Sequence, residues 1–333
     1  VEALHTGQCV AVDGFRGTVL PEPTPEQTAE FKRRQREYLA EREALSRYCN
    51  LPTVTKNGVK KAVYGNIGKP EDVQAVVQNG GEGIGLFRTE FLFMDRMSRP
   101  TEAEQFEAYA TVAKAMNGRE VIIRTLDIGG DKEIPYLEIE KEDNPFLGHR
   151  AIRYCLDHPD LFCDQIRAIL RAAKFGDLKL MLPLITCKEE ILAAKKLIEQ
   201  CLRELIEAGE DVHPVPVGIM VETPAAALTA AELAKESDFF SIGTNDLTGY
   251  VMAVDRGNQA VARLYDPMQP AVLSAIEMTI KAAKAAGIPV GMCGEGAADP
   301  RLIPHLLVWG LDEFSVSASS ILKTRKMISE EEA

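Results

Sequence analysis

The chain has 333 residues, of which 46% are apolar and 26% charged, and its 38 Lys+Arg against 50 Asp+Glu give a formal net charge of −12. This composition is typical of a globular protein with a sizeable core. The excess of acid excludes a protein whose main task is to grip nucleic acid, because such a surface must be strongly basic. No apolar run is long enough to insert across a membrane. The length allows either two domains or one large barrel with an appendage.

The cysteines and the first residue indicate the setting. The seven cysteines form no C-x-x-C pair, so the sequence predicts neither a disulfide framework nor a zinc site. A reducing, cytoplasmic location is the expectation for such a chain. The sequence begins with Val1 rather than methionine, which leads us to expect a fragment of a longer protein.

The N-terminal region is too short and too irregular to be a domain of its own. Two short β-type runs lie within the first twenty residues. Thr24 and Pro25 have the residue types of an N-cap and a first helical position, and the charged segment 26–49 reads as a connecting helix. We therefore divide the chain into a remnant of a preceding domain (1–24), a helical linker (25–57) and a main domain (58–333).

From Lys61 onward, short apolar runs alternate with longer helical patterns, as buried parallel strands do. The runs are 62–67, 83–87, 121–128, 178–185, 215–221, 238–244, 288–294 and 313–318. This number of strands predicts the α/β class and a closed (β/α)8 TIM barrel. The alternative is an open doubly wound sheet, but its glycine-rich turn follows a strand, whereas Gly80 to Gly85 precede and enter one. The long segment from Gly129 to about Phe175 predicts an insertion with its own helices.

In a barrel the active site lies where the strands end. Glu222 and Asp246 follow two successive runs, and two carboxylates with substrate oxygens and water are what Mg²⁺ typically requires. Thr223 and Pro224 predict a helix cap that fixes the backbone beside Glu222. Asn245 could add a neutral amide donor. The alternative is that each carboxylate caps a loop or pairs with a nearby arginine.

Three arginines occupy similar positions. Arg88, Arg124 and Arg256 follow or end strands, and their planar guanidinium groups suit bidentate contact with phosphate or carboxylate. Arg124 lies within an apolar run and needs a buried partner, either Asp127 or Asp131. Each arginine alone could be a structural ion pair. Three of them beside two acids predict a substrate that carries phosphate and carboxylate groups around Mg²⁺.

Cys293 and the histidines are harder to interpret from the residues alone. A lone cysteine after an apolar run is more often core filling, and the alternative is a thiol that acts as a general acid or nucleophile. The five histidines show no metal-ligand spacing. His149 alone falls near the expected site, where a packing role is favoured over a catalytic one.

A family resemblance is carried by the segments GIGLFRTEFLFM, IIRTLDIGGDK, NPFLGHRAIR, IMVETPAA, FFSIGTNDLT, AVDRGN, GMCGE and GLDEFSVSA. In these segments the chain resembles the C-terminal, phosphoenolpyruvate-binding domain of enzyme I of the bacterial phosphoenolpyruvate:sugar phosphotransferase system. The resemblance runs from about Gly58 to near the C-terminus. RTLDIGGDK and the NPFLG segment separate it from pyruvate phosphate dikinase and phosphoenolpyruvate synthase, which share the barrel and the TND and CGE motifs. Gly249 before Tyr250, and GAADP after CGE, depart from the usual pattern and leave the subgroup open.

This resemblance implies a role for each candidate residue. Phosphoenolpyruvate would be held by Arg88, Arg124, Arg150, Arg256, Asn245 and Asp246. Glu222 and Asp246 would ligate Mg²⁺. Cys293 would protonate C3 of the enolate to give pyruvate.

It also implies partners that this chain lacks. Enzyme I transfers the phosphoryl group to a histidine of its own swivelling N-terminal domain, and then to a histidine-containing phosphocarrier protein. No histidine here lies in that motif, so residues 1–24 are expected to be a remnant of the swivelling domain and the fragment is not expected to complete the transfer. A homodimer through the barrel is implied as well.

Two further functions remain open. The first is a Mg²⁺-dependent lyase or aldolase of the pyruvate-enolate type, which carbon–carbon bond cleavage by the chain would reveal. The second is a module similar to pyruvate phosphate dikinase, or else a regulatory module that binds phosphoenolpyruvate or dimerises without catalysis.

Overall fold

The computed structural model describes residues 4–14, 16–94, 96–129, 134, 136–137 and 139–333. The chain divides into two compact units, Val1–Asn50 and Leu51–Ala333. Residues 51–57, which the sequence analysis places in the linker, thus cluster with the barrel unit. No helix in the described ranges is both long and apolar enough to cross a membrane.

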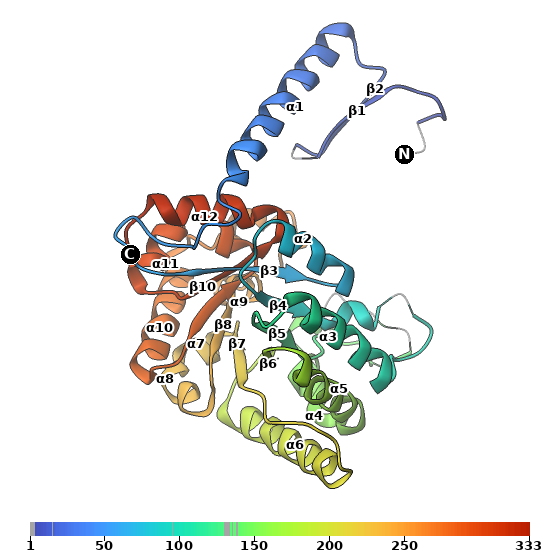
Figure 1. The fold of residues 1–333 in the computed structure, drawn as a ribbon, viewed down its shortest axis with the longest axis vertical. Coiled ribbons are helices and arrows are strands. Elements are labelled where there is room, and N and C mark those ends of the chain that lie inside the picture. The colour runs from blue at the N-terminus through green and yellow to red at the C-terminus, as the bar shows by residue number, and fades with distance from the viewer. Residues whose placement is uncertain (1–3, 15, 95, 130–133, 135, 138) are drawn as a thin grey trace. The chain divides into compact units, whose positions relative to one another are not determined.

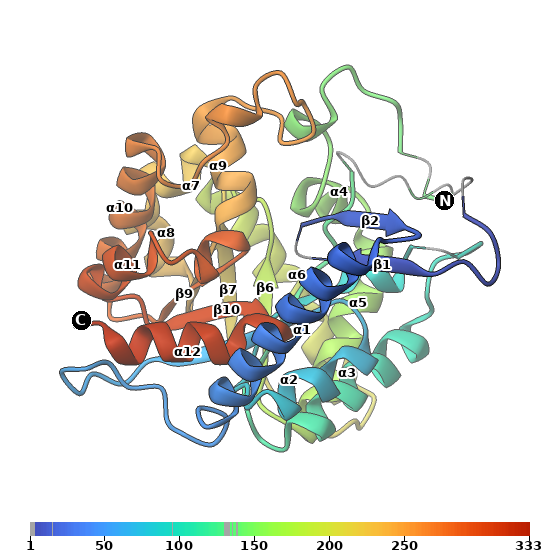
Figure 2. The same ribbon diagram turned by 90° about the horizontal axis from the view of Figure 1, so that it is seen from above.

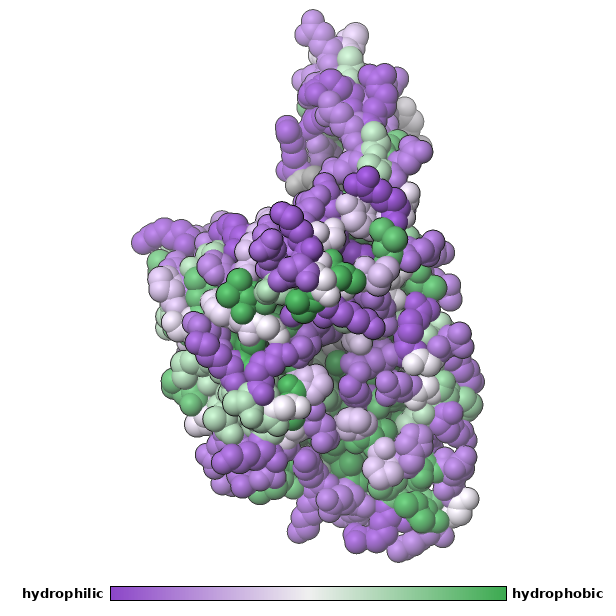
Figure 3. Space-filling view, turned by 60° about the vertical axis from the view of Figure 1, so that its left-hand side comes forward, coloured by the Kyte–Doolittle hydropathy of each residue, from purple (hydrophilic) through white to green (hydrophobic). Residues whose placement is uncertain are grey.

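The smaller unit consists of a strand pair and one long helix. Strands β1 (Val10–Asp13) and β2 (Thr18–Pro21) pair in antiparallel fashion, and α1 spans Pro25–Ser46. Thr24 caps α1 as predicted, because its side chain accepts a hydrogen bond from the Gln27 amide while the Gln27 side chain accepts one from the Thr24 amide. None of the residues of α1 is buried, and hydrophilic colours dominate the surface of this unit in Figure 3.

The larger unit is a closed barrel of eight parallel strands, as predicted, in the order β10-β3-β4-β5-β6-β7-β8-β9 (Figures 1 and 2). The strands are β3 (Ala62–Ile67), β4 (Ile84–Arg88), β5 (Val121–Arg124), β6 (Leu178–Leu182), β7 (Val217–Val221), β8 (Phe240–Gly243), β9 (Val290–Cys293) and β10 (Glu313–Ser317). Strand β5 ends earlier than its apolar run, because the Leu126 amide donates to the Gln165 side chain at 2.8 Å rather than to a strand.

Helices surround the barrel. They are α2 (Val73–Gln78), α3 (Glu102–Met116), α4 (Ile152–Asp157), α5 (Pro159–Ala172), α6 (Lys188–Glu207), α7 (Pro224–Leu228), α8 (Ala230–Leu233), α9 (Thr244–Met252), α10 (Pro270–Ala286), α11 (Ile303–Trp309) and α12 (Ile321–Glu330). Both α4 and α5 lie between β5 and β6. The predicted helical insertion at this point is therefore confirmed.

The barrel interior determines where polar side chains emerge. A small apolar cluster fills it, formed by Leu86, Ile122, Met181, Met220, Phe239 and Cys293. Side chains two residues apart on a strand share a face, so Arg124 follows Ile122 on the inner face and Glu222 follows Met220. These polar groups consequently stand above the apolar cluster, at the C-terminal ends of the strands.

Candidate active site

A cavity of about 480 Å³ opens at the C-terminal ends of the strands. Its walls come from the ends of most of the strands and from the loops that follow them. All eight residues singled out from the sequence line this one cavity: Arg88, Arg124, Arg150, Glu222, Asn245, Asp246, Arg256 and Cys293. The fold therefore gathers four guanidinium groups, two carboxylates, an amide and a thiol from segments far apart in the chain.

Arg124 is held between two buried carboxylates. Its Nη2 donates to Oε1 of Glu90 at 2.6 Å, and its Nη1 lies 3.0 Å from Oδ2 of Asp127. Asp127 is thus one partner expected from the sequence, whereas Asp131, the other, lies outside the described residues. Sequence reasoning missed Glu90, although an acidic residue two positions after the strand-end Arg88 was a usable signal. The Nε atom of Arg124 is buried and has no hydrogen-bond partner in the described structure.

Arg150 continues the same network. Its Nη2 donates to Oδ1 of Asp127 at 2.8 Å and to Oδ2 of Asp246 at 3.1 Å, and its Nη1 donates to the Tyr250 hydroxyl at 3.2 Å. Asp127 therefore bridges Arg124 and Arg150. Asp246 pairs with an arginine here, as the alternative interpretation allows, yet it still faces the cavity.

Glu222 is buried at the end of β7, where its Oε1 accepts a hydrogen bond from the Leu184 amide at 2.7 Å. Gly243 on β8 leaves room for this carboxylate, because a Cβ at that position would lie 2.7 Å from Oε2 of Glu222. The predicted cap beside it is confirmed: the Thr223 side chain accepts a hydrogen bond from the Ala226 amide, and Pro224 starts α7.

The electrostatic environment of Glu222 is unusual for a carboxyl group. Burial, together with the nearby charges of Asp246 and Asp127, raises the pKa of Glu222 to about 8, although Arg124 and Arg150 act in the opposite direction. The carboxylates therefore crowd more negative charge into the cavity than the two arginines compensate. A cation bound there would restore the ionised form of Glu222.

The donor set fits a hard divalent cation. Within the described residues, no group of three or more His, Cys, Asp and Glu side chains is arranged to hold a metal. Mg²⁺ does not need one, because one or two carboxylates with substrate oxygens and water complete its octahedron. Glu222 and Asp246 follow adjacent strands and would supply those two carboxylates.

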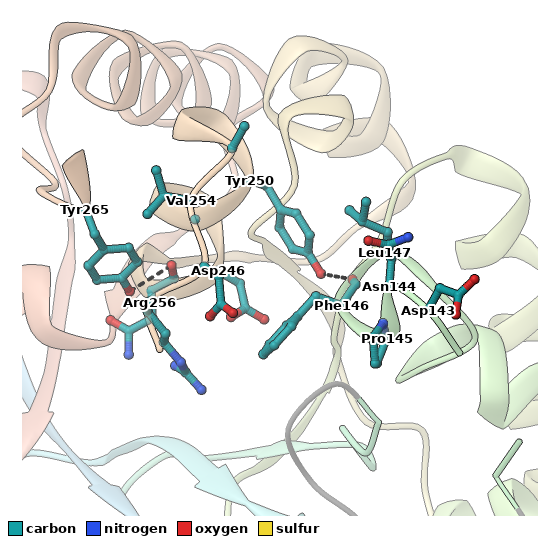
Figure 4. Close-up of a pocket in the computed structure, with 14 residues that line it drawn as sticks. Asp143, Asn144, Pro145, Phe146, Leu147, Asp246, Tyr250, Val254, Arg256 and Tyr265 are labelled. Carbon is teal, nitrogen blue, oxygen red and sulfur yellow. Dashed lines mark hydrogen bonds between the residues drawn. The ribbon is translucent and has the colours of Figure 1, made fainter. Parts of the chain in front are cut away.

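Arg88, Arg256 and Asn245 also line the cavity. The guanidinium of Arg88 lies 5.1 Å from the ring centroid of Phe91, and its Nε is buried with no hydrogen-bond partner in the described structure. Arg256 is exposed and hydrogen-bonds the side chain of Tyr265, whose hydroxyl donates to the backbone oxygen of Asn245 at 3.0 Å (Figure 4). The Asn245 side-chain oxygen accepts a hydrogen bond from the Glu295 amide at 3.2 Å. The NH2 group of Asn245 is therefore the part of its side chain that can donate to a ligand.

Cys293 ends β9 and is only 2% exposed. Burial raises the pKa of Cys293 to about 12, with the charges of Glu222 and Glu313 adding to the effect. The thiol is therefore protonated at neutral pH, the state that a proton donor requires and a nucleophile does not. Cys293 also belongs to the apolar cluster, so it is at once core filling and cavity lining.

A second cavity, of about 440 Å³, adjoins the first and was not foreseen from the sequence. Figure 4 shows three aromatic side chains around it, Phe146, Tyr250 and Tyr265. The two cavities share Asn245, Asp246 and Arg256. His149 lines neither cavity and instead packs near the rings of Tyr154 and His158, in agreement with the packing role expected for it.

Comparison with known proteins gives a consistent result. Residues 42–333 match the family described as PEP-utilising enzyme, PEP-binding domain, where PEP is phosphoenolpyruvate. The chain is 50% identical over 327 residues to phosphoenolpyruvate-protein phosphotransferase of Bacillus subtilis (strain 168), a match covering 98% of this chain and 57% of that protein. The protein of the same name from Geobacillus stearothermophilus is 51% identical over 334 residues, covering 99% and 58%.

The chain thus spans 57–58% of the length of these curated relatives. Among solved structures, an HpcH/HpaI aldolase/citrate lyase family protein from Burkholderia cenocepacia J2315 matches with a TM-score of 0.50 and 15% identity, covering 85% of this chain and 95% of that one. This likeness supports the barrel fold alone. The sequence resemblance to enzyme I is confirmed by the curated relatives, and with the family match over residues 42–333 it shows that the chain belongs to the PEP-utilising enzymes and carries their PEP-binding domain.

Proposed function

We propose that the chain binds PEP together with Mg²⁺ in the 480 Å³ cavity and donates the phosphoryl group to a histidine of another domain, releasing pyruvate. One observation carries the proposal: four arginines line a single cavity at the strand ends together with five carboxylates, among them Glu222 and Asp246. Such a mixture suits a substrate with a phosphate and a carboxylate group that shares a cation with the protein. The relatives named phosphoenolpyruvate-protein phosphotransferase support the same reaction.

The four arginines have different surroundings and therefore different roles in the proposed site. Arg124 and Arg150 are fixed by Asp127 and its neighbours, so they present their charge in a preset direction and lose little entropy on binding. Arg88, stacked on Phe91, and the exposed Arg256 face the substrate from the other side. These four guanidinium groups supply the positive charge that the phosphate and carboxylate groups of PEP meet at this mouth.

Cys293 and Asn245 act on different parts of the substrate. The Asn245 amide donates to a phosphate oxygen. When the phosphoryl group leaves, the enolate of pyruvate remains, and the proton on Sγ of Cys293 moves to its C3 carbon. Glu222 and Asp246 would hold Mg²⁺, which would supply positive charge to the anionic groups of the substrate.

The proposal extends to the rest of the protein that contains this chain. The acceptor histidine belongs to a swivelling N-terminal domain, of which residues 1–24 are the remnant, and residues 25–50 are the linker, since residues 51–57 cluster with the barrel unit. The histidine-containing phosphocarrier protein receives the group next, as the first step of the sugar phosphotransferase system. We place the protein in the cytoplasm and propose that it forms a homodimer. Light scattering with and without Mg²⁺ and PEP tests the dimer.

The experiment supplies the missing domain in trans. The chain is mixed with PEP, Mg²⁺ and the N-terminal part of the Bacillus subtilis relative, and pyruvate and phosphohistidine are quantified. Equal amounts of both products are expected, with loss in Arg88→Ala and no loss in Arg203→Ala, a control that removes the same charge from the exposed face of α6. Carbon–carbon cleavage of a 2-oxo acid substrate by the chain, without phosphohistidine, would favour the lyase alternative instead.

A further inference from the structure

Two cysteines far from the PEP cavity lie in contact across two neighbouring helices. Cys163 is on α5 and Cys201 on α6, and these helices pack against each other (Figure 1). Their thiols hydrogen-bond to one another. Cys201 is fully buried, whereas Cys163 is partly exposed. A solvent-borne reagent therefore reaches Cys163 first and finds a second thiol directly behind it.

The surroundings of Cys163 favour its reactive form. The hydrogen bond from the Cys201 thiol lowers the pKa of Cys163 and the charge of Arg167 adds to that effect, whereas burial and the charges of Glu204 and Asp160 oppose it. Arg167 stands one helical turn further along α5. The thiolate is the nucleophilic form of cysteine, so a lowered pKa and partial exposure are the two conditions that oxidation requires.

Cys201 has the complementary environment. The hydrogen bond to Cys163 and burial raise the pKa of Cys201, so this residue holds its proton until the first thiol has reacted. We propose that Cys163 and Cys201 are a peroxide-sensitive pair that closes to an intramolecular disulfide between α5 and α6. Cys163 is the attacking residue and Cys201 the resolving residue.

The reaction balances with a peroxide as the sole oxidant. The Cys163 thiolate attacks one peroxide oxygen, the O–O bond breaks, and the leaving alkoxide or hydroxide takes up a proton to give alcohol or water. Cys163 is then a sulfenic acid. The Cys201 sulfur attacks the Cys163 sulfur, the S–S bond forms, and the sulfenic hydroxyl leaves with the Cys201 proton as water. Two thiols lose two electrons in total and the peroxide gains them.

Two of the other cysteines lack this combination. Cys155 and Cys293 are buried, and burial raises the pKa of each thiol. Cys9 is exposed, so it serves as an internal reference for the reactivity of an ordinary surface thiol. The proposed disulfide involves no residue that lines the PEP cavity. It can therefore be tested independently of the proposed function.

The disulfide has a measurable consequence. It joins α5 to α6 and encloses the intervening chain, including β6. Cross-linking a loop of this kind restricts the unfolded chain. The oxidised barrel should therefore unfold at a higher temperature than the reduced one, and the difference should vanish when a reductant is added.

The test treats the folded chain with hydrogen peroxide, blocks remaining thiols by alkylation and maps the peptides by mass spectrometry. The expected product is a cross-linked pair of peptides containing Cys163 and Cys201, lighter by two hydrogens, together with the raised unfolding temperature. In Cys201→Ser the reaction should stop at a sulfenic acid on Cys163, trapped by a cyclic 1,3-dione. In Cys163→Ser, Cys201 should remain alkylatable after unfolding.

Three results would overturn the proposal. One is oxidation of wild-type Cys163 to sulfinic acid with no cross-link. Another is a cross-link that forms only in denaturant, which would show that the folded geometry does not support it. The last is modification of Cys163 no faster than that of Cys9. The first two are read from the wild-type chain, so poor folding of a variant cannot obscure them.

Discussion

The Oε1 atom of Glu90 accepts a hydrogen bond from Nη2 of Arg124 at 2.6 Å, and both side chains are buried. Glu90 follows β4 and Arg124 ends β5, so the pair joins adjacent strands at the rim of the cavity. Thr89 strengthens this link, since its hydroxyl donates to the backbone oxygen of Arg124 at 2.8 Å. The direction of the Arg124 guanidinium is therefore set before any substrate arrives.

Replacing Glu90 by alanine should strongly destabilise the fold. The change leaves a buried guanidinium without one of its two carboxylates, and losing one partner of a buried ion pair costs about 3 kcal/mol or more. Urea denaturation measures the difference. Glu30→Ala, which breaks an exposed pair with Arg33 on α1, is the control and should have a much smaller effect. Equal effects of the two substitutions would show that the Glu90–Arg124 pair does not orient the arginine.

Gly243→Ala should weaken metal-dependent substrate binding. The added Cβ would approach Oε2 of Glu222 to 2.7 Å and its Cβ to 2.9 Å, so the carboxylate must shift, and overpacking of this kind costs about 1–3 kcal/mol. Calorimetry with PEP and Mg²⁺ should show an affinity lower by about tenfold or more, since about 1.4 kcal/mol corresponds to a factor of ten. Gly14→Ala, where a Cβ meets open space, should bind normally. Unchanged affinity in Gly243→Ala would remove Glu222 from the metal site.

Cys293→Ala should separate binding from chemistry. In the proposed function the thiol donates a proton to carbon and holds no phosphate oxygen, so PEP affinity should stay within about threefold of wild type, under about 0.7 kcal/mol. Exchange of the pyruvate methyl protons with deuterated water, followed by proton NMR in the presence of Mg²⁺, should fall about a hundredfold or more, as expected for removal of a general acid–base group. Cys155→Ala, at another buried thiol, is the matched control. Exchange that persists in Cys293→Ala would assign the proton to another residue.

The pH dependence of stability should reveal Glu313, which starts β10 and is buried inside the barrel. Burial and the charge of Glu120 raise the pKa of Glu313 well above its ordinary value of 4.5, while Lys179 acts in the opposite direction. The folded state then keeps a proton that the unfolded chain loses, so this group removes stability as pH rises from about 4.5 toward the folded pKa. The titratable groups around it are Tyr64, Glu120, Lys179, Cys293 and Asp312.

Glu313→Gln carries no such proton and should escape this loss. Urea unfolding is measured at several values between about pH 5 and about pH 8. As the pH rises, the free energy of unfolding of the variant should increase relative to that of wild type, by up to about 1.4 kcal/mol per pH unit. Glu104→Gln is the control, because this exposed carboxyl, next to Arg96, has a lowered pKa and should not give a relative gain with rising pH. Parallel pH profiles for wild type and Glu313→Gln would contradict the buried, protonated state.

The sequence was informative where one physical signal dominated. Continuous apolar runs mark strands that are buried on both faces, and polar residues at the ends of parallel strands gather at the mouth; Arg124, which ends β5, and Glu222, which follows β7, illustrate this. Partner choice was less predictable. The position of Glu90 after Arg88 was a signal for a site residue, but its pairing with Arg124 depends on the register of β4 against β5, which no local pattern encodes.

The second cavity depends on a different kind of information. Its walls come from loops and from the start of α9, so its existence follows from how Phe146, Tyr250 and Tyr265 approach one another in space. Gly249, noted only as a departure from a family pattern, lines this cavity, where a Cβ would lie 3.2 Å from the Val254 backbone oxygen. A single residue thus changes the space beside the site without altering any motif.

The most direct test of the account is a calorimetric titration of the wild-type chain with PEP, first with Mg²⁺ and then with a chelator. We expect one PEP per chain in Mg²⁺ and no measurable binding in chelator, because in the proposed site PEP shares with the protein a cation that Glu222 and Asp246 would hold. Equal affinity under the two conditions would contradict the assignment of this cavity as a shared site for Mg²⁺ and PEP.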